Sequence, residues 1–374
     1  MKKLLYVVNN DNFFLSHRIN IAQAALKNNY DVHVVTNFSK FKTKIAEYGI
    51  KTHQIKPPNK KNFYYKFFPY LINLFRIIKI VKPDLVHSIT LVSILASGMI
   101  ALFLKLNLVV SFSGLGFFFT NQNYGTKIIR YFIEFTISLI FTNTPSRAIF
   151  QNKSDLKYIS SKCSIPKHRS FLIKGTGINL KYYTKFKRKK RNHTYFLMAS
   201  RILKDKGVIE YIKAAKIAKK KGVKYNFKLV GDIDSNNPSS LTFNEIKKIK
   251  AEKIIRYSRH SENIEKIIKD ACAIVLPSYR EGFPRIVIEA GALGVPAIVS
   301  DSIGTRESVI NNVTGIIVKT KDHKSLARAF IKIYNNKKKR NFLGKNALMF
   351  VSKNFDEKKI SILHLKVYEL FYKH

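Results

Sequence analysis

The chain has 374 residues, of which 46% are hydrophobic, and this length predicts two domains rather than one hydrophobic core. Its two cysteines, Cys163 and Cys272, are too few for a disulfide framework and lack the spacing of metal ligands, which is typical of a protein in a reducing compartment. The formal net charge of +45 predicts a strong attraction to anions.

Three anions are candidates for this charge: nucleic acid, an anionic membrane surface and a phosphorylated small molecule. Basic residues are spread along the whole chain without a zinc-finger, RNP-type or basic-zipper motif, which argues against nucleic acid. A genome biased toward Lys, Asn and Ile is an alternative explanation that needs no partner.

The first elements alternate between strand and helix patterns. Residues 4–8 form an apolar run that is too short for a signal peptide and is soon followed by the polar residues 9–11, so we expect a cytoplasmic protein without an export signal. A helical stretch follows at 16–28 and a second apolar run at 32–36. Strands that alternate with helices predict a parallel sheet covered on both faces.

Basic and aromatic residues are interleaved in residues 60–80, and this mixture suits the headgroup layer of a membrane. The sequence therefore predicts peripheral binding to the cytoplasmic face of the membrane. The alternative is that the aromatic side chains pack beneath a helix in the core. The residues expected to contact the membrane are the cations Lys60, Lys61, Lys66 and Arg76 and the aromatics Phe63, Tyr64, Tyr65, Phe67 and Phe68.

Residues 85–104 contain no Lys, Arg, Asp or Glu and have the length of a membrane span. His87, several hydroxyl-bearing residues and a glycine make this segment only modestly hydrophobic. Its pattern favours a strand at 85–89, a helix at 90–105 and another strand at 108–112, with a transmembrane helix as the alternative.

A second strand-and-helix series has apolar runs at 195–200, 226–230, 273–276 and 297–300. We therefore expect an α/β protein with two Rossmann-like, doubly wound domains. The charged segment 181–193 has little to bury and is the predicted hinge. The predicted domains are 1–180 and 194–350, followed by a C-terminal helix at 351–374 that packs back toward the first domain.

The segment 277–290 carries the most specific pattern. It follows a predicted strand, and in open parallel sheets ligands bind beyond the carboxyl ends of the strands. Pro284 suits the first turn of a helix, which leaves Glu281 in the loop and Glu289 inside the helix. The two carboxylates could accept hydroxyl groups from the ribose and the hexose of a nucleotide-sugar. The alternatives are a solvated loop glutamate and an i, i+4 helix charge.

The segment 200–208 ends a strand and opens a helix. A helix N-terminus carries partial positive charge and free N–H groups. With Arg201 and Lys206 beside it, the helix start near Gly207 is a candidate phosphate site that needs no metal. Two ordinary surface cations are the alternative.

Asp232 and Asp234 form an Asp-x-Asp pair, a spacing that can hold a divalent ion. Acidic loops produce this spacing by chance, and the pair lies far from Glu281 in sequence. We therefore expect no metal and no other cofactor.

The segment 277–290 resembles the E-x7-E region of family-4 retaining glycosyltransferases of the GT-B fold, and residues 300–309 and 314–318 continue the resemblance. It implies two domains facing across a cleft and sugar transfer from a nucleotide diphosphate-sugar. The donor residues that it implies are Arg201 and Lys206 at the diphosphate, Glu281 at the transferred sugar, Glu289 at the ribose, and the backbone of Gly282, Phe283 and Pro284 along the donor.

The N-terminal half departs from the family pattern, because residues 9–12 and 112–116 replace its glycine pair and its His-Gly. The loop with Gly114 and Gly116 and the segment 14–18 nevertheless resemble bacterial transferases that act on polyprenyl-diphosphate-linked glycans. These two glycines are therefore expected at the acceptor.

In the same segment, Ser16 is expected to cap a helix and to place His17 and Arg18 in its first turn, where they would hold an acceptor phosphate. An ordinary helix-surface position is the alternative for His17.

Together the resemblances imply a retaining, metal-independent transferase that moves a hexose or N-acetylhexosamine from a UDP-sugar to a lipid-linked glycan in surface polysaccharide or glycan assembly. Replacing Glu281 or Glu289 should then reduce transfer without unfolding the chain. The alternatives are a GT-B nucleotide-sugar epimerase, a phosphorylase of related fold and a basic nucleic-acid-binding protein.

Overall fold

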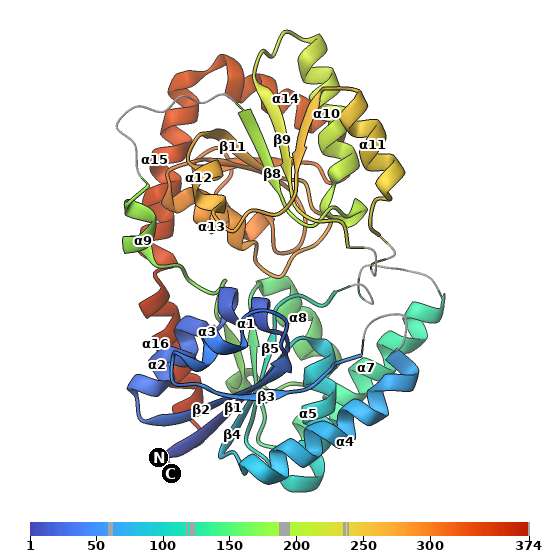
Figure 1. Cartoon of the computed structure of the whole chain (residues 1–374), viewed down its shortest axis with the longest axis vertical. Helices are drawn as coiled ribbons and strands as arrows, with labels where there is room; N and C mark the ends of the chain where they lie inside the picture. The colour runs from blue at the N-terminus through green and yellow to red at the C-terminus, as the bar shows by residue number, and fades with distance from the viewer. Residues whose placement is uncertain are drawn as a thin grey trace. The chain divides into compact units, whose positions relative to one another are not determined.

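The computed structural model of the chain describes residues 1–58, 63–116, 119, 124–186, 195–234, 237 and 239–372, with the backbone alone for Phe63 and Tyr64 (Figure 1). These residues form two units. The first comprises Met1–Gly177 and Glu357–His374, and the second comprises Ile178–Asp356.

The first unit contains a seven-stranded parallel sheet in the order β3-β2-β1-β4-β5-β6-β7. Its strands are β1 (Lys2–Asn10), β2 (Tyr30–Asn37), β3 (Lys51–Gln54), β4 (Leu85–Ile89), β5 (Leu108–Phe112), β6 (Arg147–Phe150) and β7 (Ser170–Leu172). Its helices are α1 (Asp11–His17), α2 (Ile19–Lys27), α3 (Lys42–Ala46), α4 (Phe63–Val81), α5 (Leu91–Leu104), α7 (Tyr124–Asn143), α8 (Lys153–Lys162) and α16 (Glu357–Glu369).

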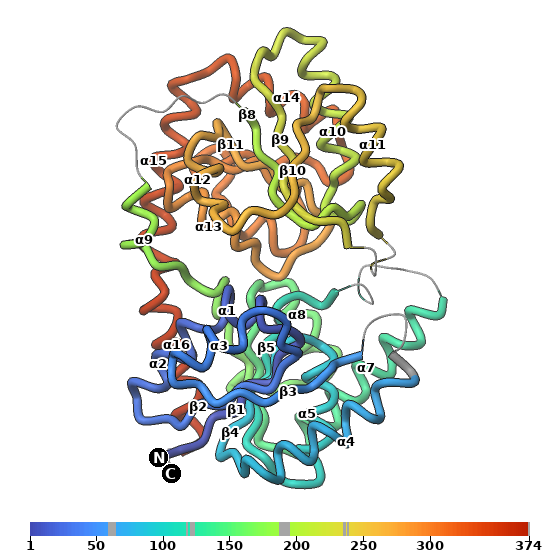
Figure 2. The backbone as a smooth tube through the Cα atoms, viewed as in Figure 1, coloured from blue at the N-terminus to red at the C-terminus, as the bar shows by residue number. Residues whose placement is uncertain are grey.

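Successive side chains of the central strands point to opposite faces of this sheet, and on each face they pack against helices. Leu5 and Val7 join one core with α4, α5 and α7, whereas Leu4 and Tyr6 join the other with α2 and α16. Figure 2 shows α4, α5 and α7 along one side of the sheet. The C-terminal helix α16 thus packs on α2, within the first unit.

The second unit contains a six-stranded parallel sheet in the order β10-β9-β8-β11-β12-β13. Its strands are β8 (Tyr195–Ala199), β9 (Asn226–Val230), β10 (Ile255–Ser258), β11 (Ala271–Leu276), β12 (Ala297–Ser300) and β13 (Gly315–Val318). Its helices are α9 (Leu180–Thr184), α10 (Val208–Lys220), α11 (Phe243–Ala251), α12 (Ile264–Ile268), α13 (Arg285–Ala292), α14 (His323–Asn335) and α15 (Lys337–Asn354). The predicted α/β class with two doubly wound domains is therefore confirmed.

Three local expectations differ from the structure. The predicted helix at 16–28 is two helices, and Ser16 is not a cap, because its hydroxyl donates to the Asn12 carbonyl inside α1 while Asn10 caps that helix. The first unit ends at Gly177, and the start of the predicted hinge 181–193 folds within α9. Residues 187–193 of this hinge lie outside the described part of the chain.

The transmembrane alternative for residues 85–104 is wrong. They form β4 and the 14-residue helix α5, which is about 21 Å long at 1.5 Å per residue and shorter than the hydrocarbon core of a bilayer. Across the described ranges, no helix is both long and apolar enough to span a membrane.

Candidate functional site

The sheet of the second unit places the two most specific sequence segments next to each other. The chain leaves β8 toward β9 on one side and later enters β11 on the other side, so the strand order reverses between β8 and β11. Ligands of open α/β sheets bind at the carboxyl ends of the strands at such a reversal. The loop after β8 carries Arg201 and Lys206, and the loop after β11 carries Glu281.

The loop after β8 ends at Gly207, whose positive φ of 77° opens α10. No described side chain caps this 13-residue helix, so the N–H groups of its first turn keep their partial positive charge. An added Cβ on Gly207 would lie 2.8 Å from the Pro277 carbonyl carbon. The start of α10 therefore packs directly against the loop after β11, and the Tyr279 N–H donates to the Asp205 carbonyl at 2.8 Å.

Lys206 and Glu281 form an ion pair within this junction. The Lys206 Nζ donates to Glu281 Oε1 at 2.6 Å, and both side chains are largely buried. The Glu281 N–H donates to the Ile303 carbonyl at 2.9 Å, which fixes the carboxylate from the backbone side. The structure thus brings together two predicted site residues that lie 75 positions apart in sequence.

Arg201 lies at the same end of the sheet and pairs with Asp234, with 3.0 Å between Nη1 and Oδ2. Asp232 accepts a hydrogen bond from the His260 N–H at 3.2 Å. The two carboxylates of the Asp-x-Asp pair therefore hold protein groups. The described residues contain no group of three or more His, Cys, Asp or Glu side chains arranged to hold a metal ion.

Glu289 lies in a buried ion pair on α13. It is 8% exposed and accepts a hydrogen bond from Arg285 Nε at 2.8 Å, one turn earlier on α13. The Tyr183 hydroxyl of α9 lies beside this pair, and burial together with the Glu289 charge raises the pKa of Tyr183. The i, i+4 alternative is confirmed for Glu289, and whether it also contacts a ribose stays a prediction.

Sequence reasoning did not assign a role to Arg285 or Tyr183. The four-residue spacing between Arg285 and Glu289 on a predicted helix was the available signal. Nothing local indicated Tyr183, because it approaches α13 only through the tertiary packing of α9.

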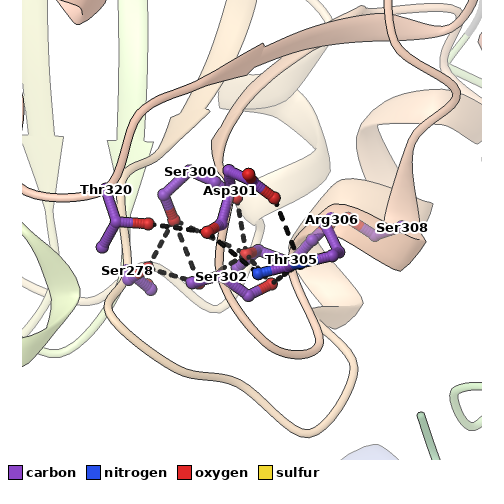
Figure 3. A network of polar contacts seen from close by, with 8 residues as sticks. All are labelled: Ser278, Ser300, Asp301, Ser302, Thr305, Arg306, Ser308 and Thr320. Atoms are coloured by element: carbon purple, nitrogen blue, oxygen red, sulfur yellow. Dashed lines mark hydrogen bonds and ion pairs between the residues drawn. The ribbon is translucent and has the colours of Figure 1, made fainter. Parts of the chain in front are cut away.

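A buried network of hydroxyl groups supports the loop after β11 (Figure 3). The Ser302 hydroxyl donates to the Ser278 carbonyl at 2.7 Å, and the Thr305 hydroxyl donates to the Ser300 carbonyl at 2.8 Å. Ser300 also donates to the Ser278 carbonyl. This network joins the ends of β11 and β12. The sequence identified residues 300–309 only as part of a family pattern, and the structure shows that hydroxyl groups of this segment support the loop after β11.

The predicted acceptor residues lie in the first unit, and Arg18 departs from its expected place. Arg18 is 1% exposed, and burial lowers the pKa of its guanidinium to about 10. Because the chain breaks between α1 and α2 at this residue, its side chain enters the core near Tyr6 and Tyr368 instead of lying on a helix surface. A buried guanidinium is not available to an acceptor phosphate at the surface of this unit.

His17 ends α1, where its ring stacks on Phe13 at 4.4 Å between centroids and its Nδ1 lies 2.7 Å from the Ser16 hydroxyl. Gly114 and Gly116 both have positive φ, of 113° and 69°, in the loop after β5. Side chains other than glycine rarely adopt this conformation. The acceptor roles of His17 and the two glycines stay predictions.

Two family models match the chain. The model described as "Glycosyl transferases group 1" matches residues 183–349, and "Glycosyl transferase 4-like" matches residues 3–144. The first match covers the loops with Lys206 and Glu281, and the second lies within the first unit.

Two relatives cover most of the chain. One is the N,N'-diacetylbacillosaminyl-diphospho-undecaprenol alpha-1,3-N-acetylgalactosaminyltransferase of Campylobacter jejuni, 27% identical over 95% of this chain and 97% of its own. The other is the capsular polysaccharide biosynthesis glycosyltransferase CapM of Staphylococcus aureus, 24% identical over 88% of this chain and 87% of its own.

The fold also matches a solved structure, Anabaena HepE in complex with UDP. Its TM-score is 0.77 at 16% sequence identity, and the match covers 99% of this chain and all of HepE. At this identity the likeness concerns the fold.

Proposed function

Because this chain belongs to the GT-B glycosyltransferases related to family 4, we propose that it transfers a hexose or N-acetylhexosamine from a UDP-sugar to a glycan on a polyprenyl diphosphate. The transfer retains the anomeric configuration. The Lys206–Glu281 pair at the start of α10 carries this proposal, since it combines a cation for a phosphate with an acceptor for a sugar hydroxyl.

The reaction breaks the bond between the sugar C1 and the diphosphate oxygen, and negative charge develops on the leaving diphosphate. Lys206, Arg201 and the N–H groups at the start of α10 stabilise that charge as it forms. Glu281 accepts a hydrogen bond from the transferred sugar beside Lys206. The acceptor hydroxyl gives its proton to the leaving oxygen and forms the new bond to C1 from the same face.

The nature of donor and acceptor is supported by the relatives. The Campylobacter jejuni protein, which matches almost the full chain, is named for an undecaprenyl-diphosphate acceptor, and HepE binds UDP. We assign the acceptor to the first unit and place the protein on the cytoplasmic face of the membrane, where such a lipid-linked glycan would be met.

A donor panel tests this function. The purified chain is incubated with UDP- and GDP-sugars and a polyprenyl-diphosphate-linked saccharide, and the lipid product is followed by mass spectrometry. A product with a UDP-sugar and a retained anomeric centre by NMR is expected. Isomerisation of the donor without any acceptor would instead identify an epimerase.

A chelator tests the absence of a metal from the mechanism. Because cationic side chains and a helix N-terminus neutralise the diphosphate in the proposed reaction, transfer should continue in excess EDTA. Complete loss that added Mg²⁺ or Mn²⁺ restores would assign a metal-binding role to Asp232 and Asp234.

A further inference from the structure

Helix α7 carries two apolar faces. Ile133, Ile137 and Ile140 lie in the core of the first unit. A second stripe, on the opposite side and also spaced by three or four residues, is between 41% and 81% exposed and consists of Tyr124, Ile128, Tyr131, Phe132, Phe135 and Leu139. Surface helices of globular proteins normally present a polar outer face, and large exposed apolar surfaces mark interaction sites.

Helix α4 repeats this arrangement. Tyr70, Leu74 and Ile78 are buried in the same core, whereas an outer stripe is exposed. That outer stripe consists of Tyr65, Phe68, Ile72 and Phe75. The alternative that the aromatics of residues 60–80 are core residues thus holds for Tyr70, and Phe67 is partly buried. Lys60 and Lys61 lie outside the described residues.

Helices α4 and α7 cover the same face of the sheet, and the two stripes lie on the sides of these helices that point away from it. Both helices pack against α5 between them, and all three cover one core layer (Figure 2). The outer sides of α4 and α7 therefore form one surface, here called the α4–α7 face. The sequence indicated only its α4 part.

The charges on this face select an anionic partner. Lys66, Arg76 and Lys79 lie on α4, which has no acidic residue, and the exposed Lys127 lies on α7, whereas Arg130 of α7 lies over the Phe119 ring at 5.4 Å. The acidic residue of α7, Glu134, accepts a hydrogen bond from the Tyr158 hydroxyl at 2.7 Å. A second copy of the chain would set these cations against identical cations.

We propose that the α4–α7 face lies in the headgroup layer of an anionic bilayer. Aromatic rings and aliphatic side chains enter the boundary with the acyl chains, and the cations bind phosphate groups of the lipids. The inference extends the proposed function by giving a second helix to the membrane contact. It is tested without donor or acceptor, so its failure would leave the proposed transfer intact.

The test is co-sedimentation of the full chain with vesicles of phosphatidylcholine alone or with phosphatidylglycerol added. Phe132→Ser with Phe135→Ser removes two outward rings of α7, and Phe243→Ser with Phe342→Ser removes two rings of similar exposure from the second unit. Binding should require the anionic lipid, fall about tenfold or more in the α7 variant, and stay unchanged in the control.

A second variant, with its own control, tests the contribution of the charges. Lys66→Gln with Lys127→Gln should weaken vesicle binding about thirtyfold, at roughly 1 kcal/mol per cation, whereas Lys221→Gln with Lys345→Gln should not. Added salt should release the wild-type protein because it screens these charges.

Three results would overturn the inference: no sedimentation of the wild type with anionic vesicles, equal binding by the α7 variant, or a wild-type dimer in solution that the α7 substitutions dissociate. Circular dichroism checks that the variants are folded, and transfer to a detergent-solubilised acceptor should survive the α7 substitutions. Absence of that transfer in the wild-type protein, with vesicle binding present, would count against the proposed function instead.

Discussion

Lys206 and Glu281 hold each other at 2.6 Å, and neither has the solvation of an exposed charge. The pair keeps both side chains in one rotamer at the reversal point of the sheet. Preorganised charges cost little reorganisation during reaction, which is why they stabilise developing charge efficiently. Each residue also depends on the other for its position.

Lys206→Ala should lower kcat/KM for the donor by about 10²- to 10³-fold, since it removes a cation from the leaving diphosphate. Lys204→Ala is the control, because this neighbouring lysine is exposed and pairs with Glu245 at 3.7 Å. Steady-state kinetics with the best donor of the panel measures both. Because Lys206 and Glu281 act together, the double variant with Glu281→Ala should lose much less than the product of the two single losses. Normal turnover by Lys206→Ala would contradict the site.

At Glu289 the structure changes the expectation that the carboxylate can be removed without a loss of stability. Arg285→Leu leaves the buried carboxylate without its cation and should reduce the free energy of unfolding by about 2 kcal/mol. Glu289→Gln keeps an acceptor oxygen and should cost less. Urea unfolding followed by circular dichroism compares the two variants.

Donor kinetics of Glu289→Gln separate the two roles of this residue. A higher donor KM with an unchanged unfolding free energy would support contact with the ribose. An unchanged KM would restrict Glu289 to its ion pair with Arg285.

The start of α10 shows how an element is positioned by one residue. Gly207 combines a positive φ with close contact to the Pro277 backbone, so any side chain meets both strain and a collision. Gly222, beyond the end of the same helix, has a φ of 87°, but an added Cβ there would lie in open space. Comparing substitutions at the two glycines therefore separates the cost of backbone strain from the cost of the collision with Pro277.

Gly207→Ala should destabilise the second unit by about 2–4 kcal/mol, whereas Gly222→Ala should cost only the backbone strain of about 1 kcal/mol. Thermal unfolding of both variants measures the difference. Gly207→Ala should also move the start of α10 and reduce transfer. Equal effects of the two substitutions would show that the contact with Pro277 is unimportant.

Helix α16 joins the first unit through a buried polar network. The Tyr368 hydroxyl lies 2.6 Å from His87 Nδ1, and His87 Nε2 lies 2.7 Å from the Ser111 hydroxyl. Burial holds the pKa of His87 and of His364 well below the usual value, and the nearby Arg18 adds to this effect. These hydrogen bonds hold helix α16 against strands β4 and β5.

These two histidines predict a pH dependence of stability. The folded state keeps them neutral, whereas the unfolded chain binds protons near pH 6.5, so their contribution is fully present above that pH. It should decline as the pH falls, by up to about 1.4 kcal/mol per pH unit for each histidine. Urea unfolding between pH 5 and 7.5 measures the slope.

His364→Leu should reduce this slope by about one proton, because it removes a buried imidazole whose Nδ1 has no hydrogen-bond partner in the described part of the chain. His168→Gln, at an exposed histidine, is the control. Identical slopes in all three proteins would exclude the buried histidines as the cause.

Much of the fold followed from local patterns in the sequence. The apolar runs of β4 and β5 and the intervening helix lie within one residue of their predicted bounds, because period and flanking residues determine such elements. The loops with Lys206 and Glu281 were recognisable for the same reason, since the turn between a strand and a helix restricts its own residues. What each loop would contact was not contained in either pattern.

Only the tertiary structure decided which distant residues meet. Strand order brings Lys206 to Glu281, the break between α1 and α2 turns Arg18 into the core, and packing of α7 leaves one of its two apolar faces exposed. Helical periodicity in the sequence predicts that one face of a helix is apolar, but it does not predict which residues pack against that face. That depends on burial against residues far away in the chain, because the hydrophobic effect is non-directional and is specified by the assembled layers.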